Sequence, residues 1–197
     1  MRFIEKTLEK AGFNPIAGVD EAGRGACAGP LLITAVILKN GIPGLKDSKE
    51  LSERERERLF PIIKANALAV SIIEVSPREI DKVGVHVANL EGMRRAVLAL
   101  AVKPEYVLTD GYAIEGLAIP NLAVWKGDQV SPSISAASII AKVTRDRIML
   151  ELGEKYPGYG LEKHKGYVNS SHTKALKELG VTEIHRRSYK NIQALVD

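Results

Sequence analysis

The fold of this chain can be worked out from one stretch near its start, Ile16-Ala17-Gly18-Val19-Asp20-Glu21-Ala22-Gly23-Arg24-Gly25. Its apolar first half predicts a buried strand over residues 16–20, and two adjacent carboxylates close that strand. Ionised side chains beside a core element are costly unless a cation compensates them. The glycines that follow let the backbone approach a ligand, and the arginine between them supplies a guanidinium. Two interpretations are open: a metal and phosphate site, or a surface turn with an acidic pair and a flexible tip.

Composition excludes several classes of protein. The chain has 197 residues, 45% of them hydrophobic and 26% charged, which predicts a folded globular protein. The single cysteine, Cys27, can form no intrachain disulfide and no thiolate metal site. No apolar stretch approaches the roughly 20 residues of a membrane span, and residues 1–6 lack a signal-peptide core. We therefore expect a cytoplasmic protein without a membrane partner, and the net charge of +4 allows a polyanionic one.

The alternation of apolar runs and turn residues predicts an α/β fold. We expect strands over residues 16–20, 30–38, 67–75, 106–109 and 117–125, the last interrupted by Pro120. Ser52 and Glu55 form a capping box that predicts a helix to about residue 65. Further helices are expected over residues 87–101 and 133–152, with a short segment from Pro77 and two pieces after residue 153.

Acidic residues recur where predicted strands end. Asp20, Glu21, Asp110 and Asp128 all lie at such ends, beside or close to a glycine, and ligands of α/β sheets bind at strand ends. Four converging carboxylates would repel one another and their pKa values would rise. A magnesium or manganese ion resolves this conflict, because hard cations prefer carboxylate and water oxygens. The set fits two-metal hydrolysis of a phosphodiester, in which one ion activates water and the other stabilises the leaving oxygen.

No competing catalytic motif is visible. The sequence has no P-loop, no His-Glu-x-x-His and no Gly-x-Ser-x-Gly. Trp125 is expected in the core rather than as a base-stacking platform. Surface or hydrogen-bonding roles, not metal ligation, are expected for the four scattered histidines, His86, His164, His172 and His185.

As a set, these motifs resemble the ribonuclease HII family. The matching pieces are residues 18–25 with Gly29-Pro30, Asp47-Ser48-Lys49-Glu50-Leu51, Thr109-Asp110-Gly111, Lys126-Gly127-Asp128, residues 134–146, Gly158-Tyr159-Gly160 and His164-Lys165-Gly166-Tyr167. They cover residues 16–190 or so in the family's order. The resemblance implies a ribonuclease H-like fold, with a central mixed five-stranded sheet flanked by helices. Residues 1–197 would form one catalytic domain, with a core of about 1–152 and a C-terminal helical segment of about 153–197.

The resemblance also implies an activity. The family cleaves the RNA strand of RNA–DNA hybrids and nicks DNA duplexes 5′ to an embedded ribonucleotide, leaving 3′-hydroxyl and 5′-phosphate ends. Its roles would be ribonucleotide removal and RNA primer removal during replication. Two Mg²⁺ or Mn²⁺ ions would bind with the substrate, and the catalytic metal ligands would be Asp20, Glu21, Asp110 and Asp128.

By the same resemblance, backbone groups of Gly23, Arg24 and Gly25 would read the ribose 2′-hydroxyl, which distinguishes RNA from DNA. Tyr167 would stack on the deoxyribose that follows the ribonucleotide while its phenol bonds the 2′-hydroxyl. Phosphate contacts are expected from Lys49, Ser135, Ser138, Lys142 and Arg145. Asp146 is expected to be a structural acid rather than a ligand. Asp81 stands where the family often has asparagine, which removes a neutral hydrogen bond to the substrate backbone.

Alternatives of other classes are a catalytically inactive hybrid-binding module and a DNA-directed nuclease of the same fold. The four carboxylates argue against a pure binding module, because phosphate binding selects against clustered negative charge. Ribonuclease HIII carries an extra N-terminal domain, which the roughly fifteen residues before the first strand are too few to form. We expect a monomer, and residues 193–197 show no obvious clamp-binding motif.

Overall fold

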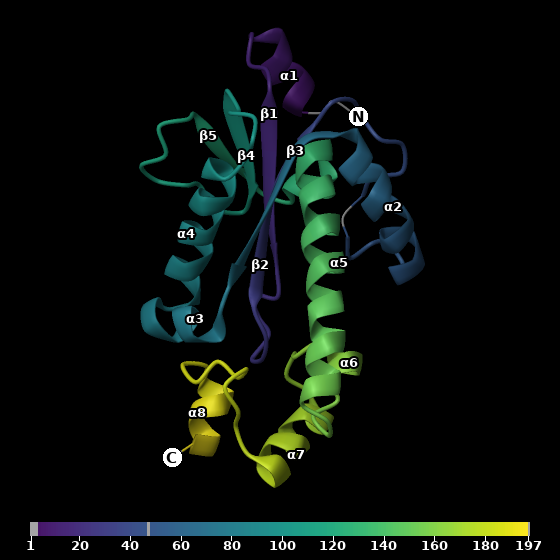
Figure 1. Ribbon diagram of the computed structural model, residues 1–197. Coiled ribbons are helices and arrows are strands. Elements are labelled where there is room, and N and C mark those ends of the chain that lie inside the picture. Colours follow the sequence, from purple (N-terminus) through teal and green to yellow (C-terminus); the bar gives the residue numbers. More distant parts are fainter. Residues whose placement is uncertain (1–3, 47, 197) are drawn as a thin grey trace.

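A five-stranded mixed sheet forms the centre of the computed structural model, which describes residues 4–46 and 48–196 (Figure 1). Its strands are β1 (Ile16–Ala22), β2 (Leu31–Leu38), β3 (Ala67–Val75), β4 (Tyr106–Asp110) and β5 (Asn121–Val124). The spatial order is β3-β2-β1-β4-β5. The first three strands pair antiparallel, and β1–β4 and β4–β5 pair parallel. This confirms the expected mixed sheet.

The helices largely follow the predicted pattern. They are α1 (Ile4–Lys10), α2 (Glu53–Asn66), α3 (Pro77–Val83), α4 (Val85–Leu98), α5 (Pro132–Lys155), α6 (Leu161–His164), α7 (Ser170–Leu179) and α8 (Lys190–Val196), with a short 3₁₀ turn, η1 (Gly127–Gln129). The capping box of Ser52 and Glu55 is present. Helix α1 was not expected, and three helices rather than two follow residue 155. Strand β5 begins only at Asn121, because Pro120 has no N–H to contribute to the ladder.

Helices cover both faces of the sheet, with α4 on one side and α5 on the other (Figure 1). On the α4 side, Ala17 and Val19 of β1 join the main apolar core. On the α5 side, a Cβ at Gly18 would lie 2.2 Å from the backbone of both Ser133 and Ile134. Only glycine allows this contact, which holds the start of α5 against β1 and brings residues 128–138 to the end of the strand.

The last part of the chain packs against the link between β1 and β2. The backbone N–H of Cys27 donates to the carbonyl of Gly166, and the N–H of Arg186 donates to the carbonyl of Cys27. Cys27 is buried in an apolar cluster with residues of α5, α6 and α7, and it forms no disulfide. In Figure 1, α6, α7 and α8 lie together at the end of the sheet where β1 passes into this link. Within the described ranges, no helix combines the length and the hydropathy of a membrane span.

Candidate active site

The sheet register places two of the predicted carboxylates next to each other. Val19 of β1 pairs with Thr109 of β4, so the residues that follow, Asp20 and Asp110, lie side by side at the ends of parallel neighbours. Successive side chains of a strand point to opposite faces. Glu21 therefore leaves β1 on the opposite side from Asp20, although both feel the charge of Asp110.

Burial and mutual repulsion of the carboxylates dominate the electrostatics of Asp20 and Glu21. Asp20 is only 7% exposed, and burial, followed by the charges of Glu21 and Asp110, raises the pKa of its carboxyl well above the usual value. Burial also raises the pKa of Glu21, an effect that the nearby cations Arg24 and Lys49 partly oppose. These directions are what the sequence predicted for carboxylates that converge without a compensating cation.

Asp128 is brought to the same place by a hydrogen-bonded turn. It is 6% exposed and lies in η1. The N–H of Gly127 donates to Oδ1 of Asp110 at 2.9 Å, which attaches η1 to the end of β4. The Ser135 hydroxyl on α5 donates to the carbonyl of Asp128 at 2.5 Å. Glu21, Asp110 and Asp128 then line one cavity of about 460 Å³.

The carboxylates fit divalent ions that they would share with a substrate. Among the described residues, no three His, Cys, Asp or Glu side chains form a group that could hold a metal ion by themselves. Magnesium seldom needs such a cage, since one or two carboxylates, waters and substrate phosphate oxygens complete its shell. One buried oxygen of Glu21, Oε2, has no hydrogen-bond partner. A buried carboxylate oxygen of this kind is suited to accept a cation.

The Gly-Arg-Gly element forms a tip that is held by the C-terminal part of the chain. Gly23 has a φ of +88°, and a Cβ there would lie 1.9 Å from Nε of Arg145. The guanidinium of Arg24 lies 4.7 Å from the centre of the Tyr112 ring. Arg186 and Tyr189 both donate to the carbonyl of Arg24, at 3.0 and 2.5 Å. The tip is therefore fixed by contacts on both sides, and the alternative of a flexible surface turn is wrong.

Tyr167 lies beside this tip. A Cβ built at Gly25 would be 3.9 Å from the Tyr167 ring, and the Arg145 guanidinium lies 5.6 Å from the ring centre. The tyrosine is 42% exposed, so a large part of it can be reached from solvent. The two elements that the resemblance assigned to the ribonucleotide thus adjoin, although more than 140 positions separate them in the sequence.

Two buried histidines hold the backbone of Tyr167, and their neighbours fix where each proton lies. The Thr182 N–H donates to Nδ1 of His185 at 3.1 Å, so His185 carries its proton on Nε2. That Nε2 lies 3.3 Å from Nε2 of His172 and donates to it. His172 therefore carries its proton on Nδ1, which lies 3.1 Å from the Tyr167 carbonyl and donates to it. Both rings must be neutral for this chain of hydrogen bonds to exist.

A third histidine supports the same turn. The Gly166 N–H donates to Nδ1 of His164, so the His164 proton is on Nε2 and donates to the carbonyl of Tyr159. The His164 ring stacks on that of His172 with the centres 4.3 Å apart. The expectation of hydrogen-bonding roles is confirmed for these histidines, and His86 is exposed as expected. Sequence reasoning missed that three scattered histidines meet below Tyr167.

Several expected phosphate contacts have internal partners instead. Arg145 is 1% exposed and donates to the carbonyls of residues 28, 30 and 165, and burial lowers the pKa of its guanidinium to about 10. This burial contradicts a phosphate contact.

The two serines of α5 also have partners within the protein. Ser138 is buried and donates to the Ser48 hydroxyl at 2.6 Å, and the Ser135 hydroxyl donates to the carbonyl of Asp128. Lys142 is half-buried and pairs with Asp146 at 2.7 Å, in line with a structural role for that acid. Lys49 is exposed and lines the cavity of Glu21 and Asp110.

One further prediction is wrong, and one further residue acquires a role that the sequence did not indicate. Trp125 is 83% exposed on the rim of that same cavity, so the expectation that it is a core residue is wrong. The Asp81 carboxylate accepts hydrogen bonds from the N–H groups of Arg187 and Ser188 and from the Ser188 hydroxyl. Its charge therefore ties α3 to the C-terminal segment.

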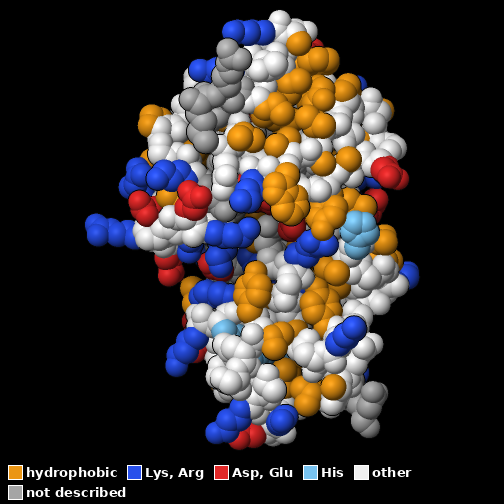
Figure 2. Space-filling view, turned by 180° about the vertical axis from the view of Figure 1, so that it is seen from behind, with side chains coloured by type: hydrophobic (Ala, Val, Ile, Leu, Met, Phe, Trp, Pro, Cys, Tyr) orange, Lys and Arg blue, Asp and Glu red, His pale blue; other side chains and the backbone are white. Residues whose placement is uncertain are grey.

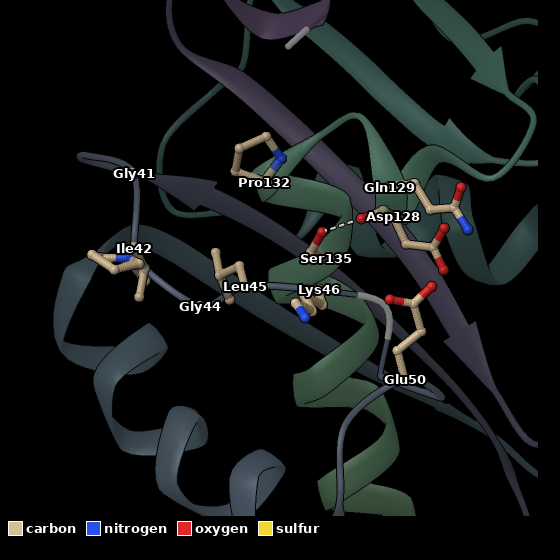
Figure 3. A pocket seen from close by; sticks show the side chains of 11 residues that line it. Gly41, Ile42, Gly44, Leu45, Lys46, Glu50, Asp128, Gln129, Pro132 and Ser135 are labelled. Atoms are coloured by element: carbon tan, nitrogen blue, oxygen red, sulfur yellow. Dashed lines mark hydrogen bonds between the residues drawn. The ribbon is translucent and has the colours of Figure 1, made fainter. Parts of the chain in front are cut away.

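A second cavity of about 640 Å³ adjoins the Asp128 side of the site. It lies between residues 41–46 and the start of α5, and Asp128 and Ser135 form part of its wall. Figure 3 shows the carboxylates of Asp128 and Glu50 at the same end of this cavity. The acidic centre is thus open on more than one side.

Acidic strand ends on a mixed sheet with helices on both faces define a nuclease of the ribonuclease H-like fold. Solved structures with this fold include a ribonuclease H2 from Pyrococcus horikoshii OT3, which has a TM-score of 0.79 and 31% identity over 91% of this chain and 96% of that one. The ribonuclease HII of a PCNA complex from Archaeoglobus fulgidus has a TM-score of 0.75 and 29% identity over 89% and 95%.

The chain belongs to the ribonuclease HII family. The family's model, described as Ribonuclease HII, matches residues 17–192. A curated ribonuclease HII from Saccharopolyspora erythraea is 54% identical over 97% of this chain and 86% of its own length. One from Mycobacteroides abscessus is 51% identical over 98% and 84%. The chain is accordingly an endonuclease of the ribonuclease H type, which acts on RNA–DNA hybrids, and its family depends on divalent metal ions.

Proposed function

We propose that Asp20, Glu21, Asp110 and Asp128 carry the cleavage, and that the enzyme nicks DNA duplexes 5′ to an embedded ribonucleotide as well as the RNA strand of hybrids. The observation that carries this proposal is the convergence of the acids at the ends of β1 and β4 and on η1, with repulsion that raises the Asp20 pKa. Ribonucleotide removal and RNA primer removal are the roles that follow.

The four carboxylates would hold two Mg²⁺ or Mn²⁺ ions together with the substrate. When bound, such ions supply an activated water and stabilise the leaving oxygen, which gives 3′-hydroxyl and 5′-phosphate ends. The protein fixes the carboxylates in place. Gly127 orients Asp110, and Ser135 holds the turn that presents Asp128. Arg24 and Lys49 bring positive charge beside Glu21, which favours its ionised form.

The tip and Tyr167 would select the ribonucleotide. Gly25 leaves room beside the tyrosine ring, and Tyr167 is 42% exposed. A hydroxyl that donates and accepts suits the ribose 2′-hydroxyl, and the ring offers a face to the next sugar. The hydrogen bond from His172 to the Tyr167 carbonyl keeps this turn in place.

One duplex tests the proposal: a DNA helix with a single ribonucleotide, incubated with Mg²⁺, Mn²⁺ or a chelator. We expect a nick 5′ to the ribonucleotide with either metal and none with the chelator. Cleavage of all-DNA duplexes would favour a DNA-directed nuclease, and binding without any cleavage would favour an inactive binding module. Full nicking in excess chelator would contradict the metal-dependent mechanism.

Asp110→Asn tests the carboxylate assignment. Asparagine keeps an oxygen for the Gly127 N–H, so the turn should persist while the charge is lost. We expect a loss of at least about 100-fold in rate, because charge stabilisation in such centres is worth several kcal/mol. Asp146→Asn is the matched control, since Asp146 pairs with Lys142, and it should keep most of the activity. Near wild-type turnover of Asp110→Asn would refute the assignment.

We also propose that the protein acts as a monomer in the cytoplasm, as expected from its sequence. Light scattering of the purified protein tests the first part, and a stable dimer at micromolar concentration would contradict it. Imaging of a tagged protein in its own cells tests the second part.

A further inference from the structure

Trp125 takes no part in the chemistry proposed above, yet its indole lies at the same cavity. It is the single tryptophan of the sequence. At 83% exposure it is more accessible than Leu98, at 67%. The cavity at its side contains Glu21, Asp110 and Asp128. A ligand that covers a large apolar ring at the edge of a functional site removes that ring from water, and this burial favours binding.

The backbone on both sides of Trp125 is fixed. The preceding residue, Val124, pairs with Asp110 at the end of β4. The following residue, Lys126, has a φ of 53°, a left-handed conformation that is uncommon outside glycine. Next, Gly127 donates to the Asp110 carboxylate, and a Cβ there would lie 2.5 Å from Cδ1 of Ile134. The Cα atom of Trp125 is therefore held at a set position relative to Asp110, and its exposed side chain starts from that position.

The surroundings of the indole match the chemistry of a nucleic-acid strand. Arg24, Lys49 and Lys126 line the same cavity and offer positive charge to phosphates. The indole adds a flat apolar surface, which the sugars and base edges displayed in a minor groove can cover. Figure 2 shows Lys and Arg side chains gathered across the middle of one face of the molecule, with hydrophobic side chains next to them.

We propose that Trp125 is a nucleic-acid contact: its indole packs on the sugar and base surface of the duplex beside the scissile phosphate. The wide, shallow minor groove of an A-like hybrid exposes such surface. This contact is apolar, so salt does not screen it, whereas a Lys126 contact to phosphate would release counterions. The inference rests on the proposed function, because that function places the scissile phosphate at Asp110 and Asp128.

Kinetics with the active enzyme and a hybrid duplex test the contact. Trp125→Ala should raise KM about 5- to 100-fold, in keeping with the loss of one stacked aromatic, and should change kcat by less than about twofold. Trp125→Phe should recover most of the affinity. Leu98→Ala, which removes another exposed apolar side chain that does not line this cavity, should leave KM unchanged. An unchanged KM for Trp125→Ala would overturn the proposal.

Salt dependence separates the indole from its charged neighbour. A plot of log KM against log salt for Trp125→Ala should run parallel to that of the wild type, displaced by the same factor throughout. For Lys126→Ala the slope should become shallower by up to about 0.9. A shallower slope for Trp125→Ala would mean that the substitution acts through lost phosphate contacts and would overturn the apolar assignment.

Fluorescence reports on the indole directly, since the protein has one tryptophan. Emission of the wild type should change when a hybrid at saturating concentration, known from KM, is mixed with the enzyme. Unchanged emission would refute the contact. The two proposals fail in different ways. If the proposed function is wrong, activity survives in Asp110→Asn; if only the Trp125 contact is wrong, Asp110→Asn still loses activity.

Discussion

Acidification should weaken the fold through His185. Burial, followed by the neighbouring His172, lowers the pKa of His185 to about 4, from an ordinary value of 6.5. Between these two pKa values the unfolded chain binds a proton on His185 that the native state does not bind. The contribution of a neutral His185 to the free energy of unfolding is therefore fully present above about pH 6.5 and is lost as the pH falls toward 4. Between about pH 7 and pH 5 this linkage removes about 2 kcal/mol of the free energy of unfolding.

The native structure opposes a second proton on His185, although the Thr182 hydroxyl oxygen lies 3.0 Å from its Nδ1. Nδ1 of His185 already accepts the Thr182 N–H, and Nε2 of His172 already accepts from His185. A second proton on either ring would therefore face another N–H. His164 stacks on His172, Cys27 lies 3.7 Å from it, and Tyr159 packs on His185, so no carboxylate among these neighbours would compensate the charge.

The assay compares variants, because the acidic site titrates in the opposite sense. The raised pKa of Asp20 means that its protonation stabilises the apo protein as the pH falls. Urea unfolding of the wild type and of His185→Gln at pH 7, 6 and 5 cancels that contribution. Glutamine can donate near the place of Nε2 but does not titrate. The wild type should lose about 2 kcal/mol more than His185→Gln between the two ends.

The exposed His86 supplies the matched control. His86→Gln should follow the wild type at every pH, because His86 is exposed and lies outside the chain of hydrogen bonds that joins His185, His172 and Tyr167. A wild-type loss that equals that of His185→Gln within about 0.5 kcal/mol would refute the assigned protons and the argument from burial.

Three further outcomes follow from the structure. Tyr167→Ala should lower nicking at a single ribonucleotide about 5- to 100-fold and affect all-RNA hybrids less; equal losses on both substrates would argue against its role in selection. Gly18→Ala should lower the free energy of unfolding by about 3 kcal/mol, because its Cβ would meet the backbone of α5, whereas Gly41→Ala, with nothing within 4 Å, should cost under about 1 kcal/mol; similar urea midpoints for the two would contradict this. Raising salt should weaken hybrid binding in a filter or anisotropy assay, and affinity that is flat with salt would speak against phosphate contacts.

The sheet could be predicted because each of its strands carries its own signal. The apolar run of β1 and the branched residues of β2 are local features, and β3 begins and ends where expected. The acidic strand ends were also visible, because a carboxylate beside a buried run is conspicuous in one dimension. Their assignment as metal ligands stays a proposal.

The sequence did not predict which cationic side chains are buried and which are exposed. Arg145 looks like a solvent-facing residue of a helix, but carbonyls from residues 28, 30 and 165 surround it. Those carbonyls come from segments more than 100 positions before it and 20 after it. The prediction for Trp125 was wrong in the opposite sense, because a residue expected to be buried is exposed. Hydrophobicity alone predicts burial, whereas the ring lies outside the core, next to the left-handed turn at Lys126.

Arg186 has a consequence for how the enzyme is made. Its guanidinium reaches the carbonyls of Arg24 and Gly29, and 162 positions separate it from Arg24. A growing polypeptide therefore exposes the acidic pair early in translation, while the support of the neighbouring tip has not yet been synthesised. Ribosome-bound chains that stop short of residue 186 should lack the ordered tip, so the timing of synthesis itself delays the appearance of a competent nuclease.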